Sequence, residues 1–192
     1  DVTEAYRVRS ELEQSRERLQ TVVDNLSEGL IVHSGDAKVL EWNPAALRLY
    51  GIDPNISRPE FLSRFALSTL DGQALEQSEW PIQRLLRGEQ LHGVTLRIRR
   101  LDIAWERVFA YGGSQIHDPG GRTVAFLTVN DITESHHAAA ALRASEERYR
   151  QIVETSQEGI WQIDAEGNTS FVNPKMAQML GFEPTEMMGV SL

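Results

Sequence analysis

The stretch EGLIVHSGDAKVLEWNPAALRLYGIDP, residues 28–54, carries most of the information about the fold. Its first half is apolar on either side of a polar turn at residues 34–36, a pattern typical of a β-hairpin. Asn43-Pro44 then predicts the start of a helix, with Asn43 as the N-cap and proline at the first helical position. Gly51 can supply a left-handed C-terminal cap, so the stretch predicts two strands followed by a short helix.

This pattern occurs twice in the chain. Residues 16–54 align without a gap with residues 146–184, and nine positions are identical. Because the identical positions include Gly, Pro and Asn residues that begin or end elements, chance similarity of two amphipathic segments is a poor explanation. Asn173 is therefore predicted to cap a helix as Asn43 does. The offset of 130 residues suits a complete domain plus a linker, and the second copy is expected to be incomplete.

The segment between the two copies predicts three more strands. Residues 57–79 predict turns and short helical pieces, and Trp80-Pro81 begins another helix. Residues 94–98, 104–111 and 122–130 then alternate between apolar and polar side chains, as strands do. The order predicts an α+β domain, a five-stranded antiparallel sheet with helices on one face and a pocket between them. Strand alternation places five residues in the pocket lining: Leu96, Ile98, Val108, Leu127 and Val129.

Two long helices are predicted to flank this domain, over residues 2–26 and 134–154. Their apolar residues recur in steps of three and four, the spacing of a coiled coil. We expect the first helix to join two chains in a parallel homodimer, although a single helix could also bury its stripe on its own domain. The predicted dimer residues of this helix are Val8, Leu12, Leu19, Val22 and Leu26.

The composition excludes several functions. The chain has 192 residues and no cysteine, so it has no disulfide, thiolate metal site or thiol nucleophile. Its 19 basic and 28 acidic residues give a net charge of −9, which disfavours nucleic-acid binding. No apolar stretch approaches the ~20 residues of a membrane span. We therefore expect a cytoplasmic fragment without membrane contact, which could still belong to a membrane-anchored parent protein.

The five histidines give little support for metal or phosphoryl chemistry. His136 and His137 are neighbours on a predicted helix, so their side chains diverge and cannot easily share one ion. His33, His92 and His117 lie near predicted strand ends or turns and are expected to be structural or exposed. The sequence has no Ser-His-Asp order, no carboxylate pair and no glycine-rich phosphate loop. We expect no metal site, no catalytic residue and no enzyme activity in this fragment.

In this order, four segments resemble the PAS sensor domains of bacterial signalling proteins. They are EGLIVHSGDAKVLEWNPAALRLYGID, WPIQRLLRGEQLHGVTLRIRR, IHDPGGR and VNDITE. The resemblance implies a PAS domain at residues 22–133, preceded by a signalling helix at 1–21. A linker helix at 134–148 and the start of a second PAS domain at 149–192 would follow.

The resemblance also implies a function. PAS domains act as sensory or dimerising modules in histidine kinases, diguanylate cyclases and similar receptors. Asp131, Ile132 and Thr133 match the family motif that joins the last strand to the exit helix, and would pass a change in the pocket or dimer interface to that helix. The outer face of the sheet would join the N-terminal helix in the homodimer.

The resemblance leaves the ligand open. Haem-binding relatives carry their axial histidine on a helix that faces the sheet, and residues 59–70 and 80–88 contain none, which leaves His92 as a remote candidate. Light-sensing relatives form their flavin adduct on cysteine, which this chain lacks. A small-molecule ligand and a filled core without any cofactor both fit the sequence. The alternative function is therefore a ligand-free dimerisation scaffold.

Overall fold

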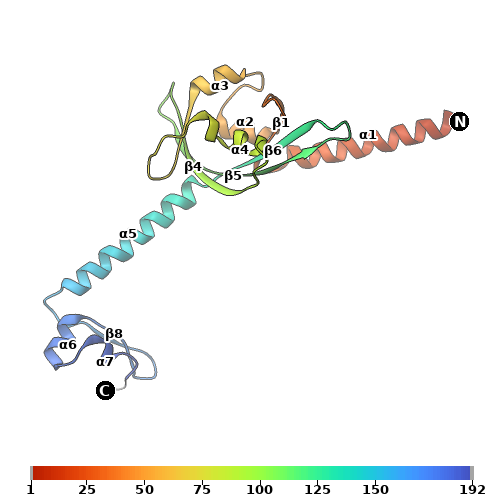
Figure 1. Cartoon of the computed structure of the whole chain (residues 1–192). Helices are drawn as coiled ribbons and strands as arrows, with labels where there is room; N and C mark the ends of the chain where they lie inside the picture. The colour runs from red at the N-terminus through yellow and green to blue at the C-terminus, as the bar shows by residue number, and fades with distance from the viewer. Residues whose placement is uncertain (1, 191–192) are drawn as a thin grey trace. The chain divides into compact units, whose positions relative to one another are not determined.

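The computed structural model describes residues 2–190, so residue 1 of the predicted helix and residues 191–192 of the predicted second domain lie outside the described residues. The chain forms two compact units, Asp1–Glu134 and Ser135–Leu192 (Figure 1). Each unit has its own sheet and its own buried core. The two units are therefore described one at a time.

The first unit begins with a long helix and continues as a mixed α and β domain. Its elements are α1 (Val2–Asp24), β1 (Gly29–Ser34), β2 (Val39–Trp42), α2 (Pro44–Tyr50), α3 (Arg58–Arg64), β3 (Phe65–Ser68), the 3-10 helix η1 (Gln77–Glu79), α4 (Pro81–Leu86), β4 (Leu91–Arg100), β5 (Glu106–His117) and β6 (Thr123–Asp131). The helix α5 (Thr133–Thr155) follows β6 directly.

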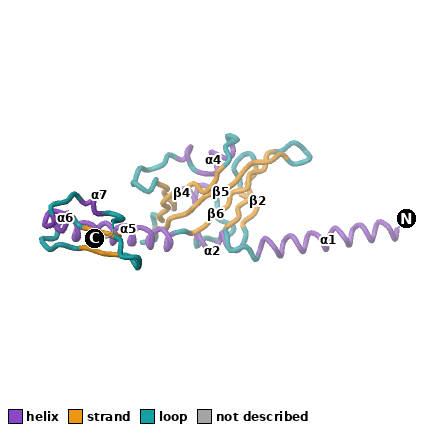
Figure 2. Tube along the Cα trace, turned by 90° about the horizontal axis from the view of Figure 1, so that it is seen from below, coloured by secondary structure: helices purple, strands orange, loops and turns teal. Residues whose placement is uncertain are grey.

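The six strands of this unit form one antiparallel sheet in the order β2-β1-β6-β5-β4-β3. They are drawn in orange in Figure 2. The predicted α+β class is confirmed, but the predicted number of five strands was wrong because β3 had been assigned to turns and short helices. β3 has only four residues and pairs at the sheet edge, where Leu67 lies opposite Ile98. Such a segment is too short for strand alternation to identify it.

The helices α2, α3 and α4 lie together on one side of the sheet (Figure 1), and the core fills the space beneath them. Tyr50, at the end of α2, is the centre of an aromatic cluster. Its ring lies 5.5 Å from the ring of Phe61 on α3, 5.7 Å from that of Phe65 and 5.5 Å from that of Phe109 on β5. These tilted and edge-on pairs hold α2 and α3 against the sheet.

The second unit repeats the start of the first. After α5 come β7 (Trp161–Ile163), β8 (Thr169–Val172), α6 (Pro174–Leu180) and α7 (Pro184–Met187). The two hairpin turns share a backbone conformation, since Ala37 has φ 62° and the equivalent Gly167 has φ 89°. The internal repeat seen in the sequence is thus a repeat of hairpin and capped helix.

Both predicted helix caps are present, and each makes more hydrogen bonds than a cap requires. The Asn43 Oδ1 accepts from the backbone N–H of Ala46 at 2.8 Å and of Leu30 at 2.9 Å. Its Nδ2 donates to the carbonyls of Val23 at 3.2 Å and Glu28 at 2.9 Å. Asn43 therefore joins the end of α1 to β1 and to the first turn of α2.

Asn173 makes the same four contacts 130 residues later. Its Oδ1 accepts from the N–H of Ile160 and Met176, and its Nδ2 donates to the carbonyls of Val153 and Glu158. The end of α5 is thus tied to the second hairpin as the end of α1 is tied to the first.

The two long helices are confirmed, whereas their pairing as coiled coils remains a prediction. Four of the predicted dimer residues lie on α1 and are between 56% and 69% exposed, whereas Leu26 lies beyond the end of the helix at Asp24 and is 40% exposed. Leu142, Tyr149 and Ile152 of α5 are exposed to a similar degree. Among the described helices, none is long and apolar enough to cross a membrane.

Replacing Asn43 by alanine is expected to destabilise the first unit by about 3 kcal/mol, because a cap is lost and several buried backbone groups lose their partners. Urea unfolding followed by tryptophan fluorescence measures the change. Asn25→Ala is the matched control, since the exposed Asn25 amide donates only to the carbonyl of Thr21. It should cost less than about 0.5 kcal/mol. Equal effects of the two substitutions would contradict the role given to Asn43.

Candidate functional site

A cavity of about 580 Å³ lies between the sheet and the helices of the first unit. This volume is in the range of small-molecule binding sites. Its floor is buried and includes Ile31, Tyr50, Trp80 and Tyr111. Its mouth is exposed at the β1–β2 turn and at the start of α3, around Lys38 and Arg58. We call this space the helix-side cavity.

The structure brings two of the five predicted lining residues to this cavity. Ile98 and Leu127 line it, whereas Leu96 and Val129 are buried in the same core but are not among the lining residues. Val108 lies on the opposite face of the sheet, because Phe109 and Tyr111 are the β5 residues that enter the core. The inward-facing positions predicted for β5 are therefore shifted by one residue from those in the structure. The role of these residues in binding a ligand remains a prediction.

Sequence reasoning missed His33 as a cavity residue. His33 was expected to be structural or exposed, but it lies on β1, lines the cavity and is only 6% exposed. Its Nδ1 is buried and has no hydrogen-bond partner among the described residues. The signal was available, because His33 is two residues after the buried Ile31 on the same strand and so shares its face.

Burial and, to a smaller extent, the nearby positive charge of Arg58 lower the pKa of His33 from 6.5 to about 4, although a backbone hydrogen bond with Ile31 acts in the opposite direction. The imidazole is therefore neutral at neutral pH. A neutral imidazole can either donate or accept a hydrogen bond at Nδ1. The cavity lining thus includes one imidazole that is uncharged at neutral pH.

The other histidines are placed away from this cavity. His92 and His117 are exposed, and His136 and His137 lie on α5 with their ring centres 6.0 Å apart. Within residues 2–190, no group of three His, Asp or Glu side chains is positioned to hold a metal ion.

Two phenols face each other at the bottom of the cavity. The hydroxyl of Tyr50 lies 3.5 Å from that of Tyr111, at the long limit of a hydrogen bond. Burial raises the pKa of both hydroxyls, so both are protonated at neutral pH. Only one of two hydroxyl hydrogens can lie between the oxygens, which leaves a second donor for another acceptor.

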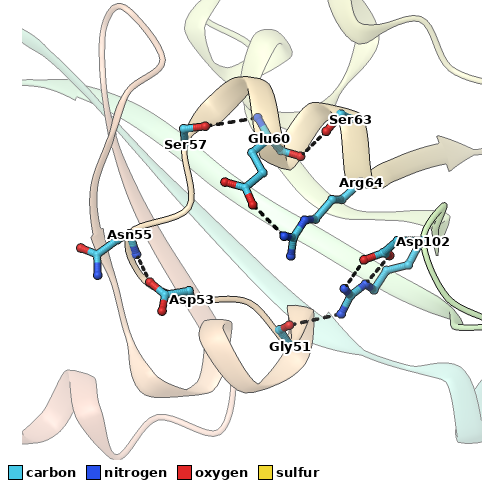
Figure 3. A network of polar contacts seen from close by, with 9 residues as sticks. Gly51, Asp53, Asn55, Ser57, Glu60, Ser63, Arg64 and Asp102 are labelled. Atoms are coloured by element: carbon cyan, nitrogen blue, oxygen red, sulfur yellow. Dashed lines mark hydrogen bonds and ion pairs between the residues drawn. The ribbon is translucent and has the colours of Figure 1, made fainter.

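The wall formed by α3 and the loop before it is held by polar contacts (Figure 3). Asp53 accepts from the N–H of Asn55, and Ser57 caps α3 by accepting from the N–H of Glu60. The Glu60 carboxylate in turn pairs with Arg64 at 2.7 Å. At the start of the loop, Arg100 of β4 donates to the carbonyl of Gly51 and pairs with Asp102. These contacts anchor the mouth of the cavity to the edge of the sheet.

The predicted relay residues join three elements at the end of β6. The Asp131 carboxylate accepts from the N–H of Thr133 at 2.9 Å and from its hydroxyl. The Thr133 Oγ1 accepts from the N–H of Val108 on β5 at 2.9 Å, and the N–H of Ile132 donates to the carbonyl of Val108 at 3.0 Å. Arg107 lies 3.6 Å from the Asp131 carboxylate. The first residue of α5 is therefore tied to both β5 and β6.

A mixed α and β domain with a cavity between its sheet and its helices has the architecture of a small-molecule binding module. Two family models match the chain. One, described as a PAS domain, matches residues 17–85, and the other, described as a PAS fold, matches residues 147–192. The chain belongs to the PAS family.

Two curated proteins are similar to this chain. Sporulation kinase E of Bacillus subtilis is 22% identical over 201 residues, covering 100% of this chain and 25% of the kinase. The alginate biosynthesis sensor protein KinB of Pseudomonas aeruginosa is 30% identical over 139 residues, covering 68% of this chain and 22% of KinB. The chain thus spans about a quarter of the length of these relatives.

A solved structure supports the fold. The PAS domain of an HTR-like protein from Haloarcula marismortui matches with a TM-score of 0.50 and 17% identity. The match covers 66% of this chain and 99% of that domain.

The pKa of His33 predicts a pH-dependent stability. Because the folded pKa of about 4 is below the unfolded value of 6.5, the unfolded chain binds a proton more readily. The free energy of unfolding is expected to be fully retained above pH 6.5 and to fall by about 3 kcal/mol as the pH drops to 4.

Urea unfolding between pH 4 and 7.5 isolates this contribution as the difference between the wild type and His33→Leu. The exposed His92→Leu is the control and should follow the wild type. If His33→Leu loses as much stability on acidification as the wild type, His33 is not a buried neutral group.

Proposed function

We propose that this chain is the sensory part of a histidine kinase. A PAS domain at residues 22–133 would detect a signal and pass it to the helix that leaves its sheet. Residues 1–21 and 134–148 would be connecting helices, and residues 149–192 would open a second PAS domain. Both curated relatives carry names of a kinase or a sensor protein, which favours this output over a diguanylate cyclase. The cytoplasmic location remains a prediction from the sequence.

One strand supports this proposal more than any other feature. β6 carries Leu127 in the wall of the cavity and Asp131 at the start of α5. The two residues are four positions apart, which is about 13 Å along a strand. A ligand that shifts β6 therefore acts directly on the junction at Asp131, Ile132 and Thr133.

The contacts at this junction suggest how a shift would reach the helix. Thr133 binds the backbone of β5 through its hydroxyl, and Asp131 binds the first N–H of α5. A change in the spacing of β5 and β6 cannot satisfy both contacts without turning the helix start. A coupling of about 1–3 kcal/mol is enough for regulation. The 580 Å³ cavity favours this sensory role over a ligand-free scaffold.

The same proposal includes a homodimer formed by α1 and the outer face of the sheet. Leu12 and Leu19 of α1 share a groove with Leu30, Val32 and Phe126 of that face. The apolar stripe of α1 is exposed in the single chain. A second copy that packs its own α1 into this region would bury both surfaces.

Asp131→Ala is expected to leave the fold intact but to reduce the coupling between signal and output by roughly 5- to 150-fold, because the N–H and hydroxyl of Thr133 lose their acceptor. The measurement is the ratio of autophosphorylation with and without stimulus in the full-length receptor. Circular dichroism checks the fold.

Asp131→Asn is the matched control, since its amide oxygen still accepts from Thr133 while the ion pair with Arg107 is lost. It should retain most of the coupling. A normal response of the alanine variant would refute the relay role.

Leu12→Lys is expected to weaken dimerisation by roughly a hundredfold or more, because a dimer buries two copies of this leucine. Sedimentation velocity from low to high micromolar protein measures the association. Gln14→Lys introduces the same charge on an exposed polar position of α1 and should leave the dimer intact. A wild-type chain that stays monomeric at high micromolar concentration would count against the dimer.

A further inference from the structure

The charge of the helix-side cavity is opposite to that of the chain. The chain has 28 acidic residues and a net charge of −9. Among the described residues, however, the cavity is lined by Lys38, Arg58 and His33 but by no aspartate or glutamate. An acid-free cavity in an acidic protein favours a negatively charged ligand.

The cations at the mouth differ in whether they already have a partner. Lys38 pairs with Asp36 at 2.8 Å, outside the cavity lining. Arg58 makes no hydrogen bond or ion pair with the described residues, and its charge acts directly on His33. The Arg58 guanidinium and the neutral His33 imidazole thus line the same space, and Arg58 has no anionic partner among the described residues.

Apart from Asn55, Gln77, Ser78 and Gln83, the rest of the lining is apolar or aromatic and fits an apolar body rather than a small inorganic ion. Trp42, Tyr50, Phe61 and Trp80 provide aromatic surface around the cavity. Aromatic side chains bind planar or branched apolar groups over large contact areas. The volume of about 580 Å³ is far larger than a free anion requires.

The internal repeat indicates that His33 and Tyr50 are not needed to form the hairpin and its capped helix. The second copy keeps the capping asparagine, but it has Ile163 in place of His33 and Leu180 in place of Tyr50. A hairpin and capped helix of this kind therefore form without the histidine or the tyrosine. His33 in the first copy is therefore available for a separate role, whereas Tyr50 also packs in the aromatic cluster that holds α2 and α3.

We propose that the helix-side cavity binds a small organic carboxylate with an aromatic or branched apolar body. Arg58 would pair with the carboxylate at the mouth, and the aromatic residues would cover the apolar body. This inference rests on the proposed sensory function and names the chemical class of its ligand.

Isothermal titration calorimetry of the 192-residue chain tests the proposal with two matched probes. These are 2-naphthylacetate and its neutral counterpart 2-naphthylacetamide. The wild type is expected to bind the acid at least tenfold more tightly than the amide, since a charged hydrogen bond is lost in the amide.

Arg58→Gln is expected to weaken binding of the acid by about tenfold and to leave binding of the amide unchanged. Arg48→Gln is the matched control. It removes the same charge from an exposed residue of α2 outside the cavity lining, and it should bind both probes as the wild type does. Inorganic phosphate at millimolar concentration should not displace the acid, because it lacks an apolar body.

Three outcomes would overturn the inference. They are equal affinity of the wild type for acid and amide, equal effects of Arg58→Gln and Arg48→Gln on the acid, and displacement of the acid by phosphate alone. The failure of this inference is distinguishable from the failure of the proposed function, because the relay and dimer experiments use no carboxylate. The coupling could depend on Asp131 even if neither naphthyl probe binds.

Discussion

The buried amide of Asn43 is the constraint on which the rest of the first unit depends. Asn43 is 1% exposed, its Nδ2 donates two hydrogen bonds to backbone carbonyls, and its Oδ1 accepts two from backbone N–H groups. A buried amide that lost any of these partners would be costly, so the end of α1, the β1 strand and the first turn of α2 must meet at one point. Because α2 is fixed there, Tyr50 at its other end is held over the sheet, where its ring packs between α3 and β5. The position of Tyr50 in the floor of the cavity follows from this attachment.

Much of this architecture could be predicted from residues that begin or end a helix. Asn43-Pro44 and Gly51 specify a capped helix because few other residues satisfy those backbone conformations. The sixth strand could not be predicted, because the four residues of β3 are stabilised by pairing with β4 rather than by their own pattern. The cavity residues were only partly predictable for a related reason. Strand alternation identifies which side chains share a face of the sheet, but it does not identify the face that meets the helices. On β5 this face carries Phe109 and Tyr111, whereas the predicted Val108 lies on the other face.

His33 shows a different limit of the sequence. Strand position alone could have assigned it to the inner face, but nothing in the sequence indicates that its Nδ1 would have no partner or that Arg58, 25 residues later, would face it. Both facts depend on the loop before α3, which is held through Arg100 and Gly51. Arg100 comes from β4, far away in the chain. The chemistry of the cavity is thus set by long-range contacts, whereas the junction at Asp131 and Thr133 combines a contact between neighbours in the sequence with contacts to β5.

The two copies of the repeat distinguish the residues that attach the hairpin to its helix from the residues that set the chemistry of the cavity. Asn43 and Asn173 make the same four hydrogen bonds, so both copies attach to their preceding helix in the same way. His33 and Ile163 occupy equivalent positions yet differ in polarity. If a sensory domain needed a particular ligand chemistry to fold, these positions could not differ so freely. The mechanical link between helix and hairpin is therefore independent of the chemistry in the cavity. A chain built in this way can change what it detects without changing how the helix is attached.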